Sequence, residues 1–405
     1  MAQTLGTPAQ TSGSASGFDR ALKEMHAPRI NMDVAAQINA VLGRLKRSAG
    51  TRDLSGRRFY EPINIRGSQA LGARSSTQTA SLPTAQNQVI VDALVPPKYL
   101  YGVIQFDLPT IKASRNDATA FARVADVELD GLRRDAIIDE NRQYLDDGVG
   151  SLGTISVSAT VATTALVMHA NHRIKPGMVI DLYTNSSGDP SSTKRVDSKT
   201  VSNVDGTTVT LAATATWLIG YHAVREDNRG NEVTGIRAIV SASGTYMGLS
   251  RSTYPEWGGT NVAAGGEQID DDLVMQLILT VQSRGRGKVN LILSDYTQFR
   301  RYGMSITGDR RYTTSMILPS GFVGLQVANA EWLPDVDHVP VTVTGLDTST
   351  ITVLEMTDGW EFDDTDGRIL HRKTGSVDYE VILVKYEEIY SNDPKANGSI
   401  TGLAA

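Results

Sequence analysis

The sequence predicts an α+β protein in which helical and strand-rich segments occupy separate parts of the chain. Apolar residues recur at helical spacing from Ser114 to Asp146 with no intervening proline. Short runs rich in Val, Thr, Ser and Ala, separated by glycine turns, fill residues 153–231. Helical and strand patterns then follow one another in the last third of the chain. Together these three observations predict the α+β class.

The composition is that of a globular protein. The chain has 405 residues, of which 40% are hydrophobic and 21% charged, enough for two or three packed units. No apolar run approaches the ~20 residues that span a bilayer, so we expect no membrane contact. The absence of cysteine excludes disulfides, thiolate metal sites and cysteine nucleophiles. A net charge of −6 argues against a dedicated nucleic-acid binder.

The first 55 residues are predicted to form an N-terminal arm. Residues 1–17 are rich in Ser, Thr, Gly and Ala and lack the basic and apolar regions of a signal peptide, so we expect a flexible arm and cytoplasmic synthesis. A helical pattern follows from Phe18 to Leu45 and is broken at Pro28. The basic stretch from Arg44 to Arg58 is interpreted as a solvated helix end and loop, with a DNA or partner contact as the alternative.

Residues 56–112 are predicted to form a long extended hairpin. Apolar extended stretches at Ile63–Ile65, Val89–Val95 and Tyr99–Phe106 surround a polar tip from Gly67 to Gln86. These stretches are too few to build a core of their own. We therefore expect the hairpin to bury its apolar residues on another surface.

The strongest local pattern is a long helix from Ser114 to about Asp146. Ser114 and Asp117 form a Ser-x-x-Asp capping box, and the apolar residues that follow recur every three or four positions. They are Ala118, Phe121, Ala125, Leu129, Leu132 and Ala136. At 1.5 Å per residue the helix would be roughly 50 Å long, longer than a compact domain needs. The pattern indicates a structural strut.

The remainder of the chain is predicted to contain a β-rich insertion and a mixed region. Residues 153–231 read as a small β-barrel or sandwich with a turn at Asp205-Gly206. A helix with an acidic first turn then runs from about Ile269 to Arg284, followed by a strand at Val289–Ser294 and a short helix through Phe299. Strands return from Phe322 to Tyr390.

Two glycine-containing motifs resemble phosphate-binding loops without the required context. Gly148-x-Gly150-x-x-Gly153 has the letters of a dinucleotide fingerprint, but it closes a helix and precedes strands, the reverse of the functional order. In the stretch from Arg284 to Lys288, the residue after the lysine is Val289, so the magnesium-binding hydroxyl is missing. We interpret the first as a turn and the second as a helix cap.

Two further patterns resemble metal sites and are also interpreted as structural. Asp363–Gly367 resembles a calcium loop, but Phe362 occupies the place of the first ligand, so a β-turn is favoured. His169 and His172 lie three apart in a strand-rich segment, which places them on opposite faces. The sequence therefore predicts no catalytic, cofactor-binding or metal-binding residue, no cofactor and no enzymatic activity.

The order of segments resembles the major capsid protein fold of tailed bacteriophages, which encapsulin shells share. The resemblance covers nearly the whole chain and rests on four stretches: VPPKYLYGVIQFDLPTIKAS from Val95, AFARVADVELDGLRRDAIIDENRQYLDDGVG from Ala120, GKVNLILSDYTQFRRYG from Gly287, and the long C-terminal stretch that begins GWEFDDTDGRILHRK at Gly359. They resemble the return of the extended loop, a spine helix ending at a DGxG turn, an axial-domain strand and helix, and closing peripheral strands.

The resemblance implies a domain order and a function. Residues 1–55 would be the arm, 56–112 the extended loop, 113–152 the spine helix of the peripheral domain, 153–231 an insertion domain, 232–325 the axial domain, and 326–405 the return through axial and peripheral strands. The chain would assemble with itself, as hexamers and pentamers, into the icosahedral capsid of a virion around double-stranded DNA. A scaffolding protein, a portal and in some cases a decoration protein would be its other partners, and assembly would occur in the host bacterial cytoplasm.

Two alternative functions remain open, an encapsulin-like compartment and a carbohydrate-binding accessory protein. An encapsulin-like compartment would need a cargo-peptide site, and a carbohydrate-binding phage accessory protein would need its four tryptophans on one platform.

Some members of the family crosslink subunits through a lysine near the loop tip. Here no lysine lies between Lys46 and Lys98, and Arg74 is the only cation of the tip. Because a guanidinium stays protonated, we expect a non-covalent shell.

Overall fold

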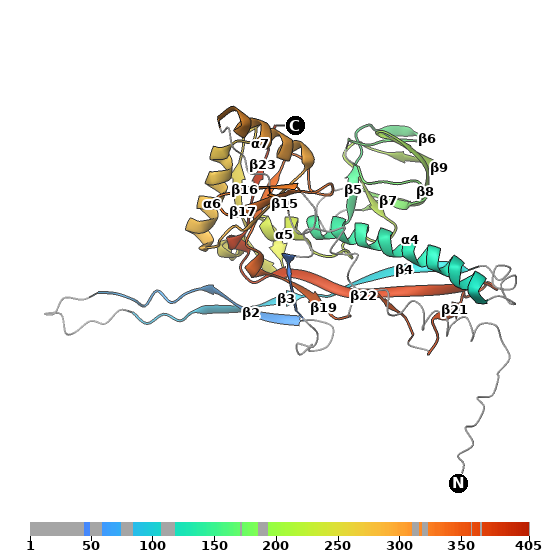
Figure 1. The fold of residues 1–405 in the computed structure, drawn as a ribbon, viewed down its shortest axis with the longest axis horizontal. Helices are drawn as coiled ribbons and strands as arrows, with labels where there is room; N and C mark the ends of the chain where they lie inside the picture. Colours follow the sequence, from blue (N-terminus) through green and yellow to red (C-terminus); the bar gives the residue numbers. More distant parts are fainter. Residues whose placement is uncertain are drawn as a thin grey trace, which may run out of the picture. The chain divides into compact units, whose positions relative to one another are not determined.

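The computed structural model describes residues 44–48, 59–73, 84–106, 118–170, 172–184, 193–309, 316–317, 323–357, 359–364 and 367–404. The predicted arm before residue 44, the capping box at Ser114 and residues 74–83 of the hairpin tip lie outside these ranges. Figure 1 shows the helices and strands of these ranges, and the chain divides into two compact units. Among the described residues, the first unit contains Leu100–Ile138 and Met356–Tyr386, and the second contains the others.

In the first unit, helix α4 (Ala118–Leu145), as far as Ile138, packs on a sheet built around the long strand β22 (Tyr379–Ser391), of which residues through Tyr386 belong to this unit. Strands β4 (Lys98–Phe106), β20 (Glu361–Phe362) and β21 (Leu370–Arg372) all pair with β22. The side chains that form the core are Ile104, Phe106, Leu129, Ile369, Leu370, Val381 and Leu383. The core therefore joins one helix to strands from both ends of the sequence.

Helix α4 confirms the predicted long helix, and Leu129 lies in the core with Leu132 packed against it. Strand β4 differs from the expected arrangement. The stretch Tyr99–Phe106 is predicted within the hairpin, but it pairs with β22 instead. Gly102 of β4 explains the close approach of the helix, because a Cβ there would lie 3.1 Å from Leu132 Cδ2.

The larger part of the second unit is a seven-stranded mixed sheet with two helices. Its strands, in spatial order, are β13 (Thr260–Ala263), β23 (Gly398–Thr401), β18 (Val343–Leu346), β14 (Leu291–Ser294), β17 (Ala330–Pro334), β16 (Val323–Val327) and β15 (Met316–Ile317). Helices α6 (Asp271–Gly285) and α7 (Tyr296–Asp309) flank β14 in sequence. Their apolar faces and Trp332 form the core of this sheet.

Helix α6 begins where its acidic first turn predicts. The Asp270 side chain caps it by accepting from Leu273 N at 2.9 Å. Helix α7 is longer than the predicted short helix through Phe299 and continues past Gly303. Tyr302 accounts for the extension, since its buried ring lies 4.3 Å from that of Trp332 and its hydroxyl donates to Asp271. Tertiary packing here outweighs the low helix propensity of glycine.

The β-rich segment forms a six-stranded antiparallel sheet within the second unit. The strands, in spatial order, are β5 (Ser151–Thr154), β10 (His222–Arg225), β7 (Val179–Tyr183), β8 (Lys194–Asp205), β9 (Thr208–Trp217) and β6 (Ala159–Val167). A bridge between Ile155 and Met168 connects the two ends of the sheet, and an apolar core that includes Leu166, Ile180 and Trp217 fills its interior. The strand-rich composition therefore predicts this region correctly.

The second unit also holds the hairpin and a short parallel pair. Strands β2 (Phe59–Arg66) and β3 (Val89–Val95) form a separate two-stranded sheet. Strand β1 (Lys46–Ser48) pairs in parallel with β19 (Ile351–Glu355), which in turn pairs with the end of β22. The short elements are α5 (Ile236–Val240), β11 (Thr245–Tyr246), β12 (Leu249–Ser250), η3 (Pro255–Trp257), η4 (Thr348–Thr350) and η5 (Pro394–Ala396).

The basic stretch that begins at Arg44 contains a strand that its sequence does not predict. Its described residues include strand β1, and Arg44 Nε pairs with Glu331 at 2.7 Å. Arg44 lies in a 3-10 turn, so the prediction fails only for Lys46–Ser48, where pairing with β19, some 300 residues later, decides the local conformation. Residues 49–58 of the stretch lie outside the described ranges. No helix in the described ranges is long and apolar enough to cross a membrane.

Candidate assembly surfaces

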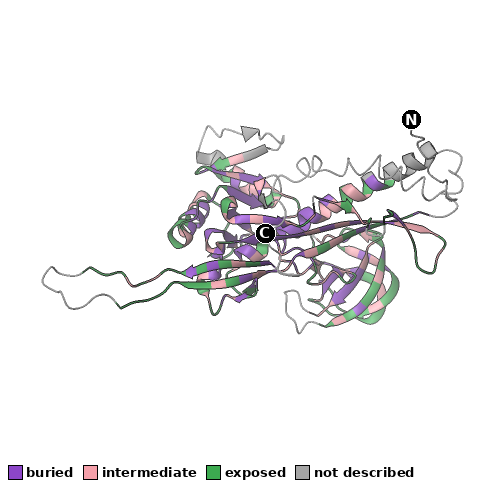
Figure 2. Ribbon diagram, turned by 90° about the horizontal axis from the view of Figure 1, so that it is seen from below, coloured by how far each residue is buried: buried purple, intermediate pink, exposed green. Residues whose placement is uncertain are grey.

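The β2–β3 hairpin has a buried base and an exposed distal part (Figure 2). At the base, Phe59 and Val95 are buried, and the ring of Phe59 lies 6.0 Å from that of Tyr390. Toward the tip, Leu71 is 91% exposed and Ile90 is 61% exposed. The base is thus fixed to its own unit, while the distal part presents apolar side chains to solvent. Such residues gain free energy only when another surface covers them.

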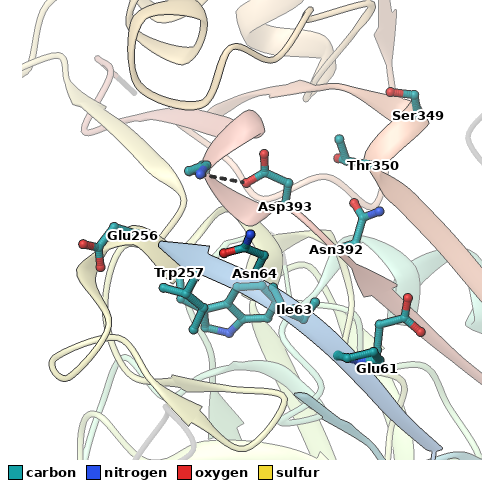
Figure 3. Close-up of a pocket in the computed structure, with 12 residues that line it drawn as sticks. Glu61, Ile63, Asn64, Glu256, Trp257, Ser349, Thr350, Asn392 and Asp393 are labelled. Carbon is teal, nitrogen blue, oxygen red and sulfur yellow. Dashed lines mark ion pairs between the residues drawn. The ribbon is translucent and has the colours of Figure 1, made fainter. Parts of the chain in front are cut away.

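A groove of about 530 Å³ lies beside β2 (Figure 3). Residues 61–65 of β2 form one wall, and η3, η4 and the residues before η5 form the others. Asp393 lies 3.9 Å from Lys395 Nζ, and burial raises the pKa of the Asp393 carboxyl. Among the described strands, β2 pairs with β3 alone. A polar groove beside a strand with one paired edge has the geometry that accepts an extended polypeptide.

Strand β4 presents an exposed apolar face in the first unit. Ile104 and Phe106 are buried in the core, whereas Tyr101 is 62% exposed and Val103 is 55% exposed. The ring of Tyr101 contacts that of Tyr386 on β22 with a centroid distance of 6.5 Å. The alternation of a strand therefore places one set of apolar residues on the core and the other at the surface.

A buried ion-pair network lies at the C-terminal end of α4, in the second unit. Arg142 is 4% exposed; its Nη2 lies 2.7 Å from Glu232 and its Nε 3.1 Å from Asp139. Burial by itself lowers the pKa of Arg142, but the two carboxylates raise it above its ordinary value. Arg225 also pairs with Asp139 at 3.2 Å. Burial alone would raise the pKa of Asp139, yet the guanidinium of Arg142 and that of Arg225 hold it below its ordinary value.

A second set of polar contacts continues from the same helix end. Asp146 accepts from Arg173 and from Arg237, both at 3.2 Å, and these three residues line a cleft of about 650 Å³. Tyr144 donates to Glu387, and the neighbouring Glu388 accepts from Thr234 N at 2.7 Å. Burial raises the pKa of Glu388 to about 8. These contacts bring together the helix end and three distant parts of the sequence, at residues 173, 234–237 and 387–388.

The sequence does not reveal these charged residues as a buried network. The run from Asp139 to Asp147 reads as the solvated end of a helix, because its charges resemble those of any exposed helix face. Burial is decided by the residues that arrive from elsewhere, above all Glu232 and Glu387. The one local signal is Tyr144, an aromatic residue within the charged run.

Comparison with known proteins identifies the fold. No protein-family model and no curated protein matches the sequence. A solved structure of the capsid asymmetric unit of Cyanophage A-1(L) superimposes with a TM-score of 0.55 at 12% identity, covering 91% of this chain and 93% of the phage chain. The chain has the capsid fold of tailed bacteriophages.

Two further structures give lower scores over similar lengths. The capsid of a native GTA particle matches with a TM-score of 0.45 at 10% identity, covering 90% of each chain. The holo-SrpI encapsulin complex from Synechococcus elongatus matches with a TM-score of 0.43 at 8% identity, covering 92% of this chain and 96% of the encapsulin. The match to the cyanophage capsid carries the assignment of the fold.

In this capsid fold the glycine motifs have structural roles. Gly148 and Gly150 adopt positive φ values of 80° and 85° in the turn between α4 and β5. At the end of α6, Arg284 donates to Gly259 O at 2.9 Å. A Cβ at Gly285 would lie 2.6 Å from Lys395 O, so glycine allows the backbone of η5 to approach. The predicted turn and helix cap are both confirmed.

His172 and the tryptophans make structural contacts in the capsid fold. His172 Nε2 lies 2.8 Å from Gly206 O, and the described residues contain no cluster of three metal-binding side chains. Gly367 N donates to Asp364 O at 2.6 Å, which fits the predicted turn. Trp217, Trp257 and Trp332 are buried, and Trp360 packs against the core of the first unit. Buried indoles of this kind form no sugar-binding platform.

Proposed function

We propose that this chain is the major capsid protein of a tailed bacteriophage, which assembles as hexamers and pentamers into an icosahedral shell around double-stranded DNA. The observation that supports this most directly is the structural match to a phage capsid chain over 91% of the present chain. A protein of this kind works by its shape, without catalytic residues or a cofactor. Its predicted partners are other copies of itself, a scaffolding protein, a portal and in some cases a decoration protein.

The surfaces described above support a shell-building role. The exposed distal hairpin, with Leu71 and Ile90, offers apolar residues for burial on a neighbouring subunit. The groove beside β2 is open to an extended segment from another copy. In this proposal, the extended loop is the β2–β3 hairpin without β4, residues 113–152 are the spine helix, 153–231 the insertion domain, and 232–325 the axial domain. Each contact is modest, and closed symmetry multiplies it.

Expression of the chain, followed by electron microscopy, tests this function. Closed shells built of hexamers and pentamers, alone or with a co-expressed scaffolding protein, are the expected result. Discrete monomers under all assembly conditions would contradict it. Native particles separate the phage capsid from its alternatives: double-stranded DNA inside supports the capsid, whereas a protein cargo bound to the inner wall supports an encapsulin-like compartment.

A further inference from the structure

Two adjacent strands of the insertion sheet carry no charged residue. Strand β6 reads ATVATTALV and strand β9 reads TVTLAATATW. The loops beside them, Ser156–Ser158 and Leu218–Gly220, are uncharged as well. The neighbouring strand β8 has the opposite character, since it contains Lys194, Arg195, Asp197, Lys199 and Asp205. We call β6, β9 and these two loops the neutral ribbon.

The neutral ribbon exposes large aliphatic side chains. Val161 is 80% exposed, Ile219 62%, Val157 53% and Leu218 48%. Val157, Leu218 and Ile219 lie close together, because Ile219 N donates to Ser158 Oγ at 2.8 Å and Trp217 Nε1 donates to Val157 O at 3.1 Å. Val161 follows two residues after Ala159, which pairs with Trp217. A group of exposed aliphatic residues on an uncharged background is the composition of an interaction surface.

Strand β6 is also the last strand in the spatial order of its sheet. One edge pairs with β9 (Figure 1). At the other edge, among the described residues, Ser156 N donates to Val167 O at 2.9 Å, which covers the end of the strand but not its first half. Proteins usually protect such an edge with a charged residue or a proline. Strand β6 contains neither.

We propose that the neutral ribbon is a contact between two copies of this chain, in which β6 pairs antiparallel with β6 of the second copy across a two-fold axis. A symmetric pairing brings the same residues together, so charges on β6 would repel, and it has none. A charged partner would lose hydration against this ribbon without finding an opposite charge. The inference rests on the proposed shell function, which supplies the copies.

The contact is expected to be weak in isolation. A nine-residue strand with a few aliphatic neighbours is small beside the ~800 Å² that each partner buries in a stable complex. Free subunits should therefore remain unpaired at this edge, whereas neighbouring subunits held together in a shell should pair. This places the contact between subunits that other interfaces already bring together.

Single-cysteine variants test the pairing directly, because the chain contains no cysteine of its own. In a symmetric antiparallel pair only the residue on the two-fold axis faces itself, so the variants must cover the first half of β6 residue by residue. We would assemble shells from Thr160→Cys, Val161→Cys, Ala162→Cys and Thr163→Cys and expose them to mild oxidation. Facing residues in an antiparallel pair have Cα atoms about 4.5–5.5 Å apart, a distance that a disulfide can bridge. At least one of the four variants should give a covalent dimer on a non-reducing denaturing gel. Thr200→Cys, on an exposed position of β8, is the matched control and should stay monomeric.

The possible outcomes separate this inference from the proposed function. A dimer from one or two β6 positions, absent in the control and in free subunits, supports the pairing. Shells that form normally but give no dimer at any β6 position overturn it while leaving the shell function intact. Equal dimer from Thr200→Cys overturns it too, because the crosslink would then reflect random collisions. Failure of the unmodified chain to form shells under any condition removes both proposals.

Discussion

Replacing Arg142 with methionine should destabilise the protein strongly. Methionine keeps most of the side-chain length but removes the charge, so Glu232 and Asp139 lose the group that compensates their burial. Glu232 is 2% exposed, and among the described residues Asn228 Nδ2, at 3.2 Å, would be its remaining side-chain hydrogen-bond donor. Breaking a buried ion pair from one side typically costs about 3–5 kcal/mol of unfolding free energy.

Urea denaturation of the unassembled subunit measures this loss. The midpoint for Arg142→Met should fall clearly below that of the unmodified protein. The double variant Arg142→Met, Glu232→Gln should recover part of the loss, because it removes the uncompensated carboxylate. The matched control is Arg66→Met, which breaks the exposed pair with Glu256, whose side chains are 52% and 38% exposed, and should leave the midpoint unchanged.

The difference in stability between Arg142→Met and the unmodified protein should depend on pH because of Asp139. Burial by itself would raise the pKa of Asp139, but the positive charges of Arg142 and Arg225 outweigh burial and lower the pKa in the folded protein. The stability that it contributes is therefore present above the unfolded pKa, about 3.9, and is lost as the pH falls through the lower folded value. The difference between the two proteins should shrink in that acidic range. An Arg142→Met variant as stable as the unmodified protein at neutral pH would refute this account of the network.

Four further predictions concern assembly and stability. Deleting Gly67–Gln86 should leave a soluble subunit that assembles poorly, and normal particle yield would count against the loop assignment. Leu129→Asp should lower the unfolding free energy by several kcal/mol, because it places a charge in the core beneath α4; unchanged thermal melting would argue that this position is not packed. Mature particles should give a single band near 43.6 kDa on a denaturing gel, and a ladder of covalent oligomers would disprove the non-covalent shell. Burial raises the pKa of Glu388 to about 8, so the stability of the folded protein should decrease as the pH rises from the pKa of an unfolded glutamate through 8. Glu388→Gln should therefore make the thermal midpoint fall less steeply over that pH range, and an equally steep fall in the variant would contradict this account.

Elements whose pattern is local could be predicted from the sequence. Helix α4 appears where the periodic apolar residues placed it, and α6 begins at its acidic cap. The strands of residues 153–231 follow from β-branched runs between glycine turns. The roles of Gly148 and Arg284 were also predictable, because a phosphate-binding motif is defined by the elements around it, and those elements could be read from the sequence.

Only the tertiary structure decided which segments pair and which charges are buried. The alternation in Tyr99–Phe106 shows that one face is covered, but nothing local specifies that β22, almost 300 residues later, provides the partner strand. Strand β1 and the length of α7 depend on β19 and Trp332 in the same way. The charged run at the end of α4 is the clearest case: Arg142 looks like a solvated residue in the sequence and becomes a buried ion-pair partner because Glu232, 90 positions away, meets it. Local periodicity thus determined the helices and strands of this protein, whereas contacts between distant residues determined which strands pair and which charges are buried. The physical reason is that the desolvation of a residue depends on what covers it and not on its neighbours in the chain.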